Sequence, residues 1–456
     1  MEMWIPEKAA EIIRVLMNHG FEAYAVGGCV RDSILGRKPE DWDITTSARP
    51  EEVKRIFPRT VDTGIEHGTV TVLMDREQFE VTTYRVDGEY TDHRHPKEVT
   101  FTASLEEDLK RRDFTINAMA YNPETGLVDI FQGIEDLERK IIRCVGDPGE
   151  RFDEDALRIL RAIRFSAQLG FVIDDATKQA MSERAETLKD VSAERIRVEL
   201  VKLLVSAYPE KIREACRLGI TRVVLPEYDA IVGVEQHTPN HIYDVEEHTI
   251  RALCNVEPES VLRLTMLLHD FGKPIVKKTD NGRDIFYKHP EVSARMCRDI
   301  LRRLKFDNHT LDRVYRLVKW HGLKYLPNDI SVRKALNRVG QDIFEDFIKV
   351  QRADISAKNP KVVDEKLAML AEKEKIYRKI VERGDCFEVK RLAVNGRDLI
   401  QSGIPQGPIL GAILERLVEL VIEDPELNEK ERLLEKASQI KDDPSIFDEK
   451  QYFFEP

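Results

Sequence analysis

Three acidic residues near the start of the chain have the types and the spacing of a metal site. Asp41 and Asp43 are two positions apart, a spacing that puts both carboxylates on one face of an extended strand. Glu80 lies in a second predicted strand, where Phe79 and Val81 point to the opposite face. Carboxylate oxygens suit Mg²⁺, and two such ions can activate a 3′-hydroxyl and neutralise a leaving pyrophosphate. An isolated Asp-x-Asp is usually a solvated turn, so this interpretation depends on the residues around it.

A glycine turn and two arginine-bearing segments supply groups that suit a triphosphate. Gly27 and Gly28 follow a short apolar strand, where the backbone can approach phosphates closely and offer amide donors. Arg31 follows at helical spacing and can hold a phosphate oxygen through two hydrogen bonds. Farther along, Arg112 and Asn117 flank an apolar run and suit a triphosphate and a sugar hydroxyl. Arginines at the start of an element are, however, usually surface charges.

The segment 154–165 predicts a helix with a regular polar stripe. Asp155, Arg158, Arg161 and Arg164 recur at every third residue beside an apolar stripe. A salt-bridged surface helix would show the same spacing. The sharper hypothesis is that a carboxylate acceptor and a guanidinium donor, side by side, pair with the edge of a nucleobase and so replace a nucleic-acid template.

Histidines are concentrated in the middle of the chain, where seven of the 11 fall between residues 237 and 321. His248 lies on a predicted helix, His269 and Asp270 are adjacent after an apolar helix, and Asp354 follows farther along. Imidazole and carboxylate together suit Mn²⁺, Fe, Ni²⁺, Co²⁺ or Mg²⁺ with bound water, and such a metal turns water into a hydroxide nucleophile. A lone histidine on a helix is usually structural, but His-Asp-Phe-Gly-Lys-Pro after an apolar helix is far more specific.

The elements that must position these residues change character along the chain. In the first third, segments 70–74 and 79–84 predict two strands joined by a polar turn, and helical spacings lie between the strands. From about Glu154 onward nearly every segment has helical periodicity, including an amphipathic helix at 413–422 after a Gly/Pro turn at 403–411. The predicted fold class is therefore α+β, with a small mixed α/β head followed by an all-helical neck, body and tail.

Composition sets the broad class of protein. The chain has 456 residues, a length that suggests two to four domains. Hydrophobic residues make up 42% and charged residues 34%, and no apolar run is long enough to predict a membrane span. The six cysteines are scattered and no signal pattern opens the chain, so we expect reduced thiols in a cytoplasmic protein. The net charge of −12 argues against nucleic-acid binding by the surface as a whole, but it allows a local basic face.

Taken in order along roughly the first 220 residues, these motifs resemble the class II tRNA nucleotidyltransferases, the CCA-adding branch of the DNA polymerase β superfamily. The resemblance implies a polymerase β-like head in which Asp41 and Asp43 bind Mg²⁺ and Glu80 is the third acid. It also implies that Asp155 and Arg158 read CTP and ATP. The other residues that it implies for nucleotide binding are Gly28, Arg31, Arg112, Asp113, Asn117, Arg161 and Arg164.

The same resemblance covers two further features and names partners. The loop 89–97 matches a loop implied in the switch from C to A addition, and the turn 405–408 resembles part of a tail that holds tRNA. The implied partners are the acceptor arm of tRNA, CTP and ATP, whereas the sequence does not indicate an oligomeric state. The expected domains are a head at 1–146, a helical neck at 147–225, a histidine-bearing domain at 226–360 and a helical tail at 361–456.

The histidine pattern resembles the HD-domain phosphohydrolases. The resemblance implies one divalent transition metal, such as Ni²⁺, Mn²⁺ or Co²⁺, bound by His248, His269, Asp270 and Asp354. His289 and His321 would add a second metal or bind phosphate. Some bacterial CCA-adding enzymes carry such a domain, which is linked to phosphodiesterase and phosphatase activity. The remaining histidines of this region, His237, His241 and His309, are expected to be structural.

Three alternatives remain open. Poly(A) polymerases, and partial enzymes that add only CC or only A, share the head motifs, but the intact loop 89–97 and the complete string at 154–158 favour full CCA addition. A metal phosphohydrolase whose head only binds RNA would be favoured by a missing head carboxylate, and none is missing. A non-enzymatic RNA chaperone would not need two complete sets of acidic residues.

Overall fold

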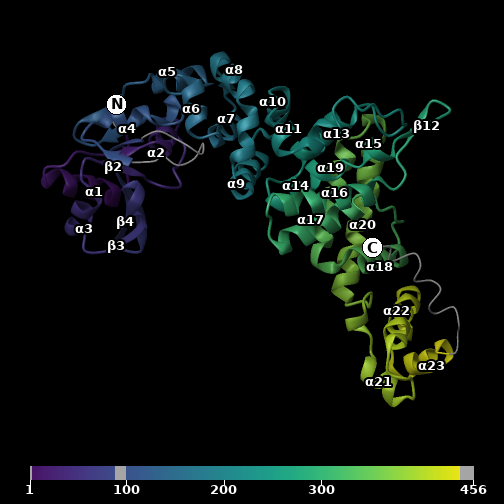
Figure 1. Ribbon diagram of the computed structural model, residues 1–456. Coiled ribbons are helices and arrows are strands. Elements are labelled where there is room, and N and C mark those ends of the chain that lie inside the picture. Colours follow the sequence, from purple (N-terminus) through teal and green to yellow (C-terminus); the bar gives the residue numbers. More distant parts are fainter. Residues whose placement is uncertain (1–2, 88–98, 442–456) are drawn as a thin grey trace. The chain divides into compact units, whose positions relative to one another are not determined.

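The chain folds into two compact units. The computed structural model describes residues 3–87 and 99–441, so the predicted loop 89–97 lies outside the described residues. Unit 1 comprises residues 1–230 with 302–306, and unit 2 comprises residues 231–301 with 307–456. A sheet with its covering helices opens unit 1, and the rest of the described chain is mostly helical (Figure 1), which confirms the α+β prediction.

The head of unit 1 is built on a seven-stranded sheet with the strand order β3-β4-β5-β2-β1-β8-β9. Its strands are β1 (Ala23–Val26), β2 (Ile44–Thr46), β3 (Thr60–Gly64), β4 (Thr69–Met74), β5 (Glu77–Thr83), β8 (Met119–Asn122) and β9 (Gly126–Asp129). Strands β2 and β5 are parallel, whereas the other neighbouring pairs are antiparallel. Helix α1 (Glu7–Asn18) packs beside β1, and its buried Ala9, Ile12 and Leu16 have the spacing of one helical face. The predicted strands at 70–74 and 79–84 are confirmed as β4 and β5.

Short helices connect the head strands, and longer ones form the neck. Helices α2 (Gly28–Ile34) and α4 (Leu105–Lys110) belong to the head, and the neck includes α6 (Pro148–Glu154), α7 (Leu157–Leu169) and α9 (Ala193–Leu204). The prediction of one helix over 154–165 is wrong at its start. Asp155 has an extended backbone with φ −141° and ψ 102°, and its side chain accepts a hydrogen bond from the Leu157 amide at 3.1 Å. An aspartate that bonds a backbone amide two residues on interrupts a helix and begins the next one.

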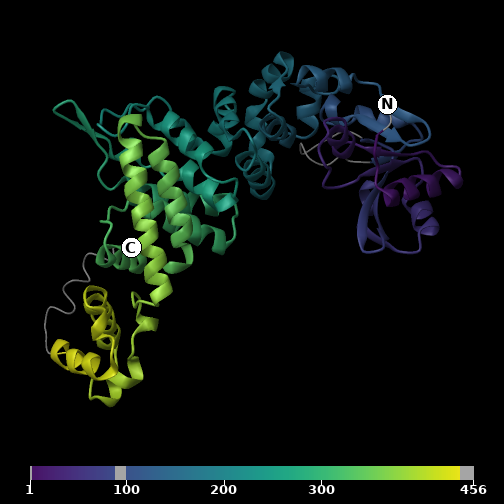
Figure 2. The same cartoon turned by 180° about the vertical axis from the view of Figure 1, so that it is seen from behind.

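Unit 2 begins with packed helices that surround a buried polar centre. These helices are α13 (Val245–Asn255), α14 (Ser260–Leu268), α16 (His289–Arg303), α17 (Asn308–Trp320), α19 (Phe344–Ser356) and α20 (Pro360–Arg383). Figure 2 shows the long helix α20 beside its neighbour α19. The expectation of nearly continuous helix missed the hairpin of β12 (Lys278–Asp280) and β13 (Arg283–Ile285), which projects from these helices in Figure 1. Its turn, Asn281-Gly282, has positive φ at both residues, the geometry that Asn-Gly favours between paired strands.

The C-terminal part of unit 2 has a small apolar core of its own. Buried Leu399, Leu417 and Leu433 join α21 (Gly396–Gln401), α22 (Pro408–Glu423) and α23 (Lys430–Ile440). Helix α22 begins five residues before the predicted start at Ile413, because Pro408 occupies the first helical turn, where proline is well tolerated. No helix in the described ranges is long and apolar enough to span a membrane.

Candidate active site and metal centre

The two aspartates of the acidic motif precede a strand rather than lie within it, because β2 begins only at Ile44. The extended chain before β2 keeps the alternation that the sequence predicts, since Asp41 and Asp43 are exposed and Trp42 between them is buried. Trp4 packs edge-on against Trp42, with 6.2 Å between ring centroids. An aromatic contact therefore holds the apolar side of this segment while both carboxylates face away from it.

Sheet register brings the third acid to the same place. In the parallel pair of β2 and β5, Ile44 lies beside Val81. Asp43 and Glu80 each precede one of these partners by one residue, so they stand at the same height and on the same face. Glu80 is exposed, whereas Val81 is buried, as the sequence predicts. The strands therefore bring Asp41, Asp43 and Glu80 together.

The charges of these three acids act on one another. Although the residue Asp43 is exposed, neighbouring protein atoms displace part of the solvent around its carboxyl, and this desolvation raises its pKa. The charge of Arg112 lowers the pKa, and the charges of Glu80 and Asp41 raise it further. The net effect is a raised pKa for Asp43. An acid whose ionisation is disfavoured by two neighbouring carboxylates on an open face belongs to a donor set that a divalent cation stabilises. This donor set therefore fits Mg²⁺.

A glycine turn stands beside the acids. Gly27, the residue before α2, has φ 82°, and a Cβ built there would lie 3.0 Å from a terminal nitrogen of Arg112. Arg112 pairs only loosely with Asp108, at 3.6 Å, and its buried Nε has no hydrogen-bond partner among the described residues. The turn and the guanidinium thus offer donors next to the carboxylates, as a triphosphate requires.

Four of the other predicted nucleotide ligands form one hydrogen-bonded network. Arg31 donates to Asp32 at 2.9 Å and to the Asn117 side chain at 2.7 Å, and Asn117 in turn donates to Asp113 at 3.0 Å. The second oxygen of Asp113 accepts from Arg161 at 2.5 Å. Burial would raise the pKa of Asp113, but Arg161 and Asn117 lower it well below its ordinary value. Asp113 therefore stays ionised and fixes the positions of the groups around it.

The two residues expected to read the base have different partners among the printed contacts of their side chains. Asp155 is paired with Arg195 at 2.8 Å, whereas Arg158 is bound by Glu154 at 2.5 Å and by the Arg111 carbonyl at 2.9 Å. The Arg158 amide donates to the Asp155 carbonyl at 3.0 Å. The continuous helix from which the side-by-side arrangement was hypothesised is interrupted at Asp155.

Sequence reasoning missed the partners of this stripe. Arg195 holds Asp155, and the buried Glu199 binds Arg164 at 2.5 Å. Both partners lie on α9. Glu199 could have been found from the sequence, because it lies among the apolar residues of one helical face and a buried carboxylate needs an ion pair.

In unit 2 the predicted histidine ligands converge on two buried aspartates. His248 Nε2 lies 3.1 Å from Asp354 Oδ1, and His269 Nε2 lies 3.1 Å from Asp270 Oδ2. The other two predicted imidazoles approach the second oxygen of Asp270, with His289 Nε2 at 3.4 Å and His321 Nε2 at 3.7 Å. The adjacent His269 and Asp270 both reach this centre at the point where α14 ends at Leu268.

Each of the four imidazoles is oriented by the backbone. The Nδ1 atoms lie within hydrogen-bond distance of backbone carbonyls: His248 at 3.2 Å from Ala357, His269 at 2.7 Å from Met266, His289 at 2.8 Å from Phe286 and His321 at 2.7 Å from Val318. An Nδ1–H donated to a carbonyl leaves Nε2 with a lone pair. All four lone pairs then point to the same carboxylates, which is the donor set of a transition-metal site.

Protonation states agree with that role. Desolvation lowers the pKa of His248 and of His289, and it lowers the pKa of His321 to about 3. Burial alone would raise the pKa of Asp270, but His269 and Lys273 hold it well below its ordinary value. For these three histidines and for Asp270, the neutral imidazole and the ionised carboxylate that result at neutral pH are the forms that bind a metal.

Two lysines that the sequence analysis did not single out balance the carboxylates. Lys273 Nζ lies 2.6 Å from Asp270, and Lys358 pairs with Asp354. Lys273 follows the His-Asp pair by one helical turn, so its spacing was the available signal. The histidines expected to be structural differ in setting: His309 is exposed, His237 contacts Asp284 at 2.9 Å, and the His241 ring packs against His248.

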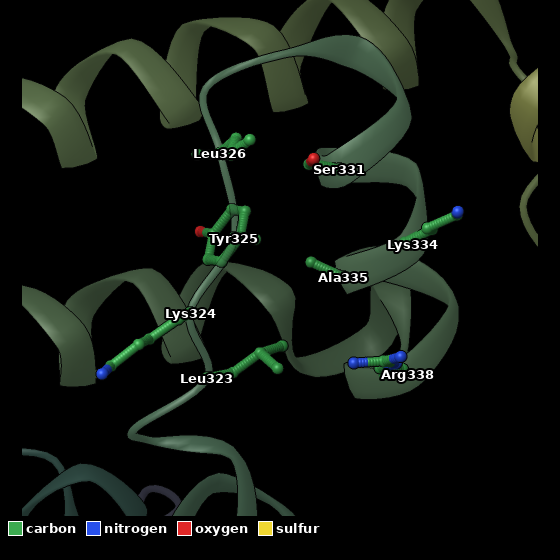
Figure 3. A pocket seen from close by; sticks show the side chains of 8 residues that line it. All are labelled: Leu323, Lys324, Tyr325, Leu326, Ser331, Lys334, Ala335 and Arg338. Atoms are coloured by element: carbon green, nitrogen blue, oxygen red, sulfur yellow. The ribbon is translucent and has the colours of Figure 1, made fainter.

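A separate hollow of about 220 Å³ lies in unit 2, between residues 323–326 and α18 (Asp329–Val339). Figure 3 shows Leu323 and Leu326 pointing into it, with Ser331 and Arg338 at opposite ends. It is lined by no residue of the histidine centre.

The head fold and its acidic face define a nucleotidyltransferase. Residues 23–143 match the family described as poly A polymerase head domain, residues 170–232 match the RNA and SrmB-binding site of polymerase A, and residues 286–437 match tRNA nucleotidyltransferase domain 2.

The chain belongs to the family of CCA-adding enzymes. It is 37% identical to the CCA-adding enzyme of Levilactobacillus brevis over 94% of this chain and 96% of that one. The structure of the Bacillus stearothermophilus CCA-adding enzyme in complex with CTP is 30% identical and covers 95% of this chain and 96% of its own, with a TM-score of 0.72. The Thermotoga maritima CCA-adding enzyme complexed with tRNA shares the fold at 20% identity, with a TM-score of 0.60 and 96% of each chain covered.

Proposed function

We propose that this chain adds C, C and A to the 3′ end of tRNA, using CTP and ATP and releasing pyrophosphate. One observation carries the proposal: in a member of the CCA-adding family, Asp41, Asp43 and Glu80 come together on the face beside the Gly27 turn. Asp41 and Asp43 would hold Mg²⁺, which activates the 3′-hydroxyl and neutralises the leaving pyrophosphate.

The remaining residues bind and orient the nucleotide. The amides after Gly27, with Gly28, Arg31 and Arg112, hold the triphosphate, and Arg112 keeps positive charge beside Asp43. Asn117 and Asp113 lie next to Arg31 and suit the sugar. Asp155 and Arg158 read the base after exchanging their present partners, with Arg161 and Arg164 in support.

A gel assay with tRNA transcripts tests this proposal. Transcripts that end before C or after CC, and an RNA without an acceptor stem, are each incubated with CTP, ATP or both. Ordered addition of C, C and A that then stops is the expected result. Long A tails on any RNA would instead identify a poly(A) polymerase, and addition of only CC or only A would identify a partial enzyme.

The histidine centre supports a second function, a metal-dependent phosphohydrolase. The observation that favours it is the backbone orientation of four imidazoles toward Asp270 and Asp354. His248, His269, Asp270 and Asp354 would hold one divalent transition metal such as Ni²⁺, Mn²⁺ or Co²⁺, with His289 and His321 at a second metal or a phosphate. Such a metal supplies a hydroxide nucleophile.

Metal analysis and hydrolysis test this second function together. The chain loaded with Mn²⁺, Co²⁺ or Ni²⁺ should hydrolyse bis-p-nitrophenyl phosphate, and Asp270→Asn should lose both the bound metal and the activity. His309→Gln, at an exposed position of α17, is the matched control. A chain that binds none of the three metals at the centre would refute this function without affecting CCA addition.

In this proposal, each of the four expected domains has its own part in the function. A head at 1–146 carries transfer, a neck at 147–225 reads the nucleotide, a histidine domain at 226–360 hydrolyses, and a tail at 361–456 holds the tRNA acceptor arm. We propose that this work takes place in the cytoplasm, which tRNA, CTP and ATP as substrates and the scattered cysteines of the sequence support.

A further inference from the structure

Gln78 lies on the acidic face of the head sheet, beside Glu80. Phe79, between them on β5, is buried, so the side chains of Gln78 and Glu80 share the opposite, exposed face. No hydrogen bond joins the Gln78 amide to another described residue. We propose that this amide binds the 2′-hydroxyl of the last nucleotide of the tRNA and so places the neighbouring 3′-hydroxyl for attack. The inference rests on the proposed CCA addition and adds a residue that binds the acceptor end.

Two of the directions around Glu80 are already taken. Beyond it on the same face, Thr82 lies in register with Thr45, whose hydroxyl donates to Asp108 at 3.0 Å. Asp108 belongs to α4 and is fully buried, so α4 covers this end of the face. Toward the middle of the sheet, β2 and then β1 follow β5, and the Gly27 turn that suits the triphosphate comes directly after β1.

The geometry of the reaction leaves the remaining side to the tRNA end. In an in-line displacement, the attacking 3′-oxygen and the leaving pyrophosphate lie on opposite sides of the reacting phosphorus. With the pyrophosphate on the β1 side of the acids, the 3′-oxygen comes from the side of β5 and β4. On β4, the hydroxyls of Thr69 and Thr71 are already bonded to other threonines, at 3.0 and 2.8 Å, whereas the Gln78 amide has no partner among the described residues.

The chemistry of the contact matches an RNA end. A carboxamide offers two N–H donors and a carbonyl acceptor, and a 2′-hydroxyl both donates and accepts, so the two groups can bond in either sense. Residues two apart on a strand are about 7 Å apart. A ribose whose 3′-oxygen lies at the Glu80 end of this gap can place its 2′-oxygen, on the adjacent carbon, toward Gln78. Half-buried Leu73, opposite Gln78 on β4, gives the sugar carbons an apolar surface.

The β4–β5 hairpin that carries Gln78 is held from its other face. Lys8 Nζ of α1 lies 2.8 Å from Glu77 and 4.0 Å from Asp75 in the turn. Glu77 is the neighbour of Gln78 on β5 and so points to the opposite face. The strand beneath Gln78 is therefore fixed without use of the face that would receive the ribose, and a residue on a fixed strand orients its ligand precisely enough for attack.

A double comparison of chain and tRNA tests the inference. Two tRNA transcripts that end just before the first C, one with an ordinary terminal ribose and one with a 2′-deoxyribose, receive CTP from the full chain under single-turnover conditions. The wild-type chain should prefer the ribose end, and in Gln78→Met this preference should shrink about fivefold, the effect of about one hydrogen bond. The influence of the 2′-hydroxyl on the reactivity of its own 3′-hydroxyl is the same for both chains and cancels. The KM for CTP should stay near wild type.

A matched variant separates contact from hairpin position. Glu77→Gln weakens the pair with Lys8 on the opposite face, so it disturbs the hairpin but should keep the wild-type preference. An unchanged preference in Gln78→Met overturns the inference, even if both transcripts react more slowly, and so does an equal loss in Glu77→Gln. If the wild-type chain adds C to neither transcript, CCA addition and the inference fall together, whereas normal addition with an unchanged preference in Gln78→Met removes the inference alone.

Discussion

The side chain of Asp43 shows how one carboxylate can be needed for chemistry and unfavourable for folding. Its pKa is raised in the folded chain, so the folded state holds its proton more tightly than the unfolded state does. For an acid with a raised pKa, stability falls as the pH rises through the ordinary value of about 4, so the ionised group destabilises the fold at neutral pH.

We therefore expect Asp43→Asn to abolish nucleotide addition without lowering the melting temperature. Losing a metal ligand removes several kcal/mol of transition-state stabilisation, so addition should fall below about one per cent. Asp75→Asn, at an exposed turn position, is the control for a lost surface charge. Addition above that level, with Asp43 replaced, would contradict its role as a ligand.

The histidine centre predicts a pH dependence of the opposite sign. Desolvation lowers the pKa of His248, His289 and His321 in the folded chain. Below about pH 6.5, these histidines therefore bind protons in the unfolded chain that they do not bind in the folded chain. The lowered pKa values of Asp270 and Asp354 act only near and below pH 4, where these groups would begin to take up protons in the unfolded chain.

Between pH 6.5 and 5, therefore, the melting transition of the metal-free chain should shift to lower temperature, and His321→Gln should flatten that shift. His309→Gln, which is exposed, should leave it unchanged. Calorimetry at half-unit pH steps measures both, and a shift of equal size in wild type and His321→Gln would refute the assignment.

At this scale the sequence names candidate ligands but few of their partners. Residue type and spacing single out Asp41, Asp43 and His269, because a metal needs particular donor atoms, and their binding of a metal stays a prediction. The partners Arg195 and Glu199 lie far along the chain from the residues they bind, on a helix with no motif of its own. Only the packing of elements reveals such pairs.

The turn from β1 into α2 ties local backbone geometry to triphosphate binding. Gly27 has φ 82°, and any Cβ there would press on Arg112 at 3.0 Å, so Gly27→Ala adds strain of about 1–3 kcal/mol and displaces the guanidinium. We expect the KM values for CTP and ATP to rise together, because the triphosphate is common to both.

Gly36, at the other end of α2, is the matched control. Its φ is also positive, at 67°, but a Cβ there meets nothing within 4 Å. Gly36→Ala should thus reproduce the lost stability and leave both KM values near wild type. Steady-state kinetics with each nucleotide decides, and equal KM changes in the two variants would show that strain alone is responsible.

The break between α6 and α7 is where element-level prediction failed, and it bears on base selection. A period of three residues looks helical through Asp155, but one side-chain hydrogen bond to the Leu157 amide ends that helix. Asp155 therefore has an extended backbone, whereas Arg158 lies in α7, and the two residues pair with different partners, Arg195 and Glu154.

We expect Arg158→Ala to blur the choice of CTP and ATP over GTP and UTP more than it weakens triphosphate binding. Arg151→Ala is a close control, since Arg151 also pairs with Glu154, at 2.6 Å, and donates to a head carbonyl, that of Lys110, at 3.1 Å. Misincorporation measured with each single nucleotide should rise only in Arg158→Ala. Equal fidelity in the two variants would remove Arg158 from base reading.

For the molecule as a whole, the net charge of −12 disfavours a polyanionic partner, and the salt dependence of tRNA binding tests whether a local basic face overcomes this. A chain that binds tRNA through a local basic face releases counterions from several phosphates, so its affinity falls steeply with salt even though the total charge is negative. CTP carries only one triphosphate to a partly buried site, where screening is weaker. The KM for tRNA should therefore rise by on the order of tenfold or more between 50 and 200 mM salt, while the KM for CTP changes much less.

Kinetics at matched osmolarity, with sucrose replacing salt, separate charge from water activity. An equal salt dependence of the two KM values would mean that no local basic face exists and that tRNA is held mainly by shape.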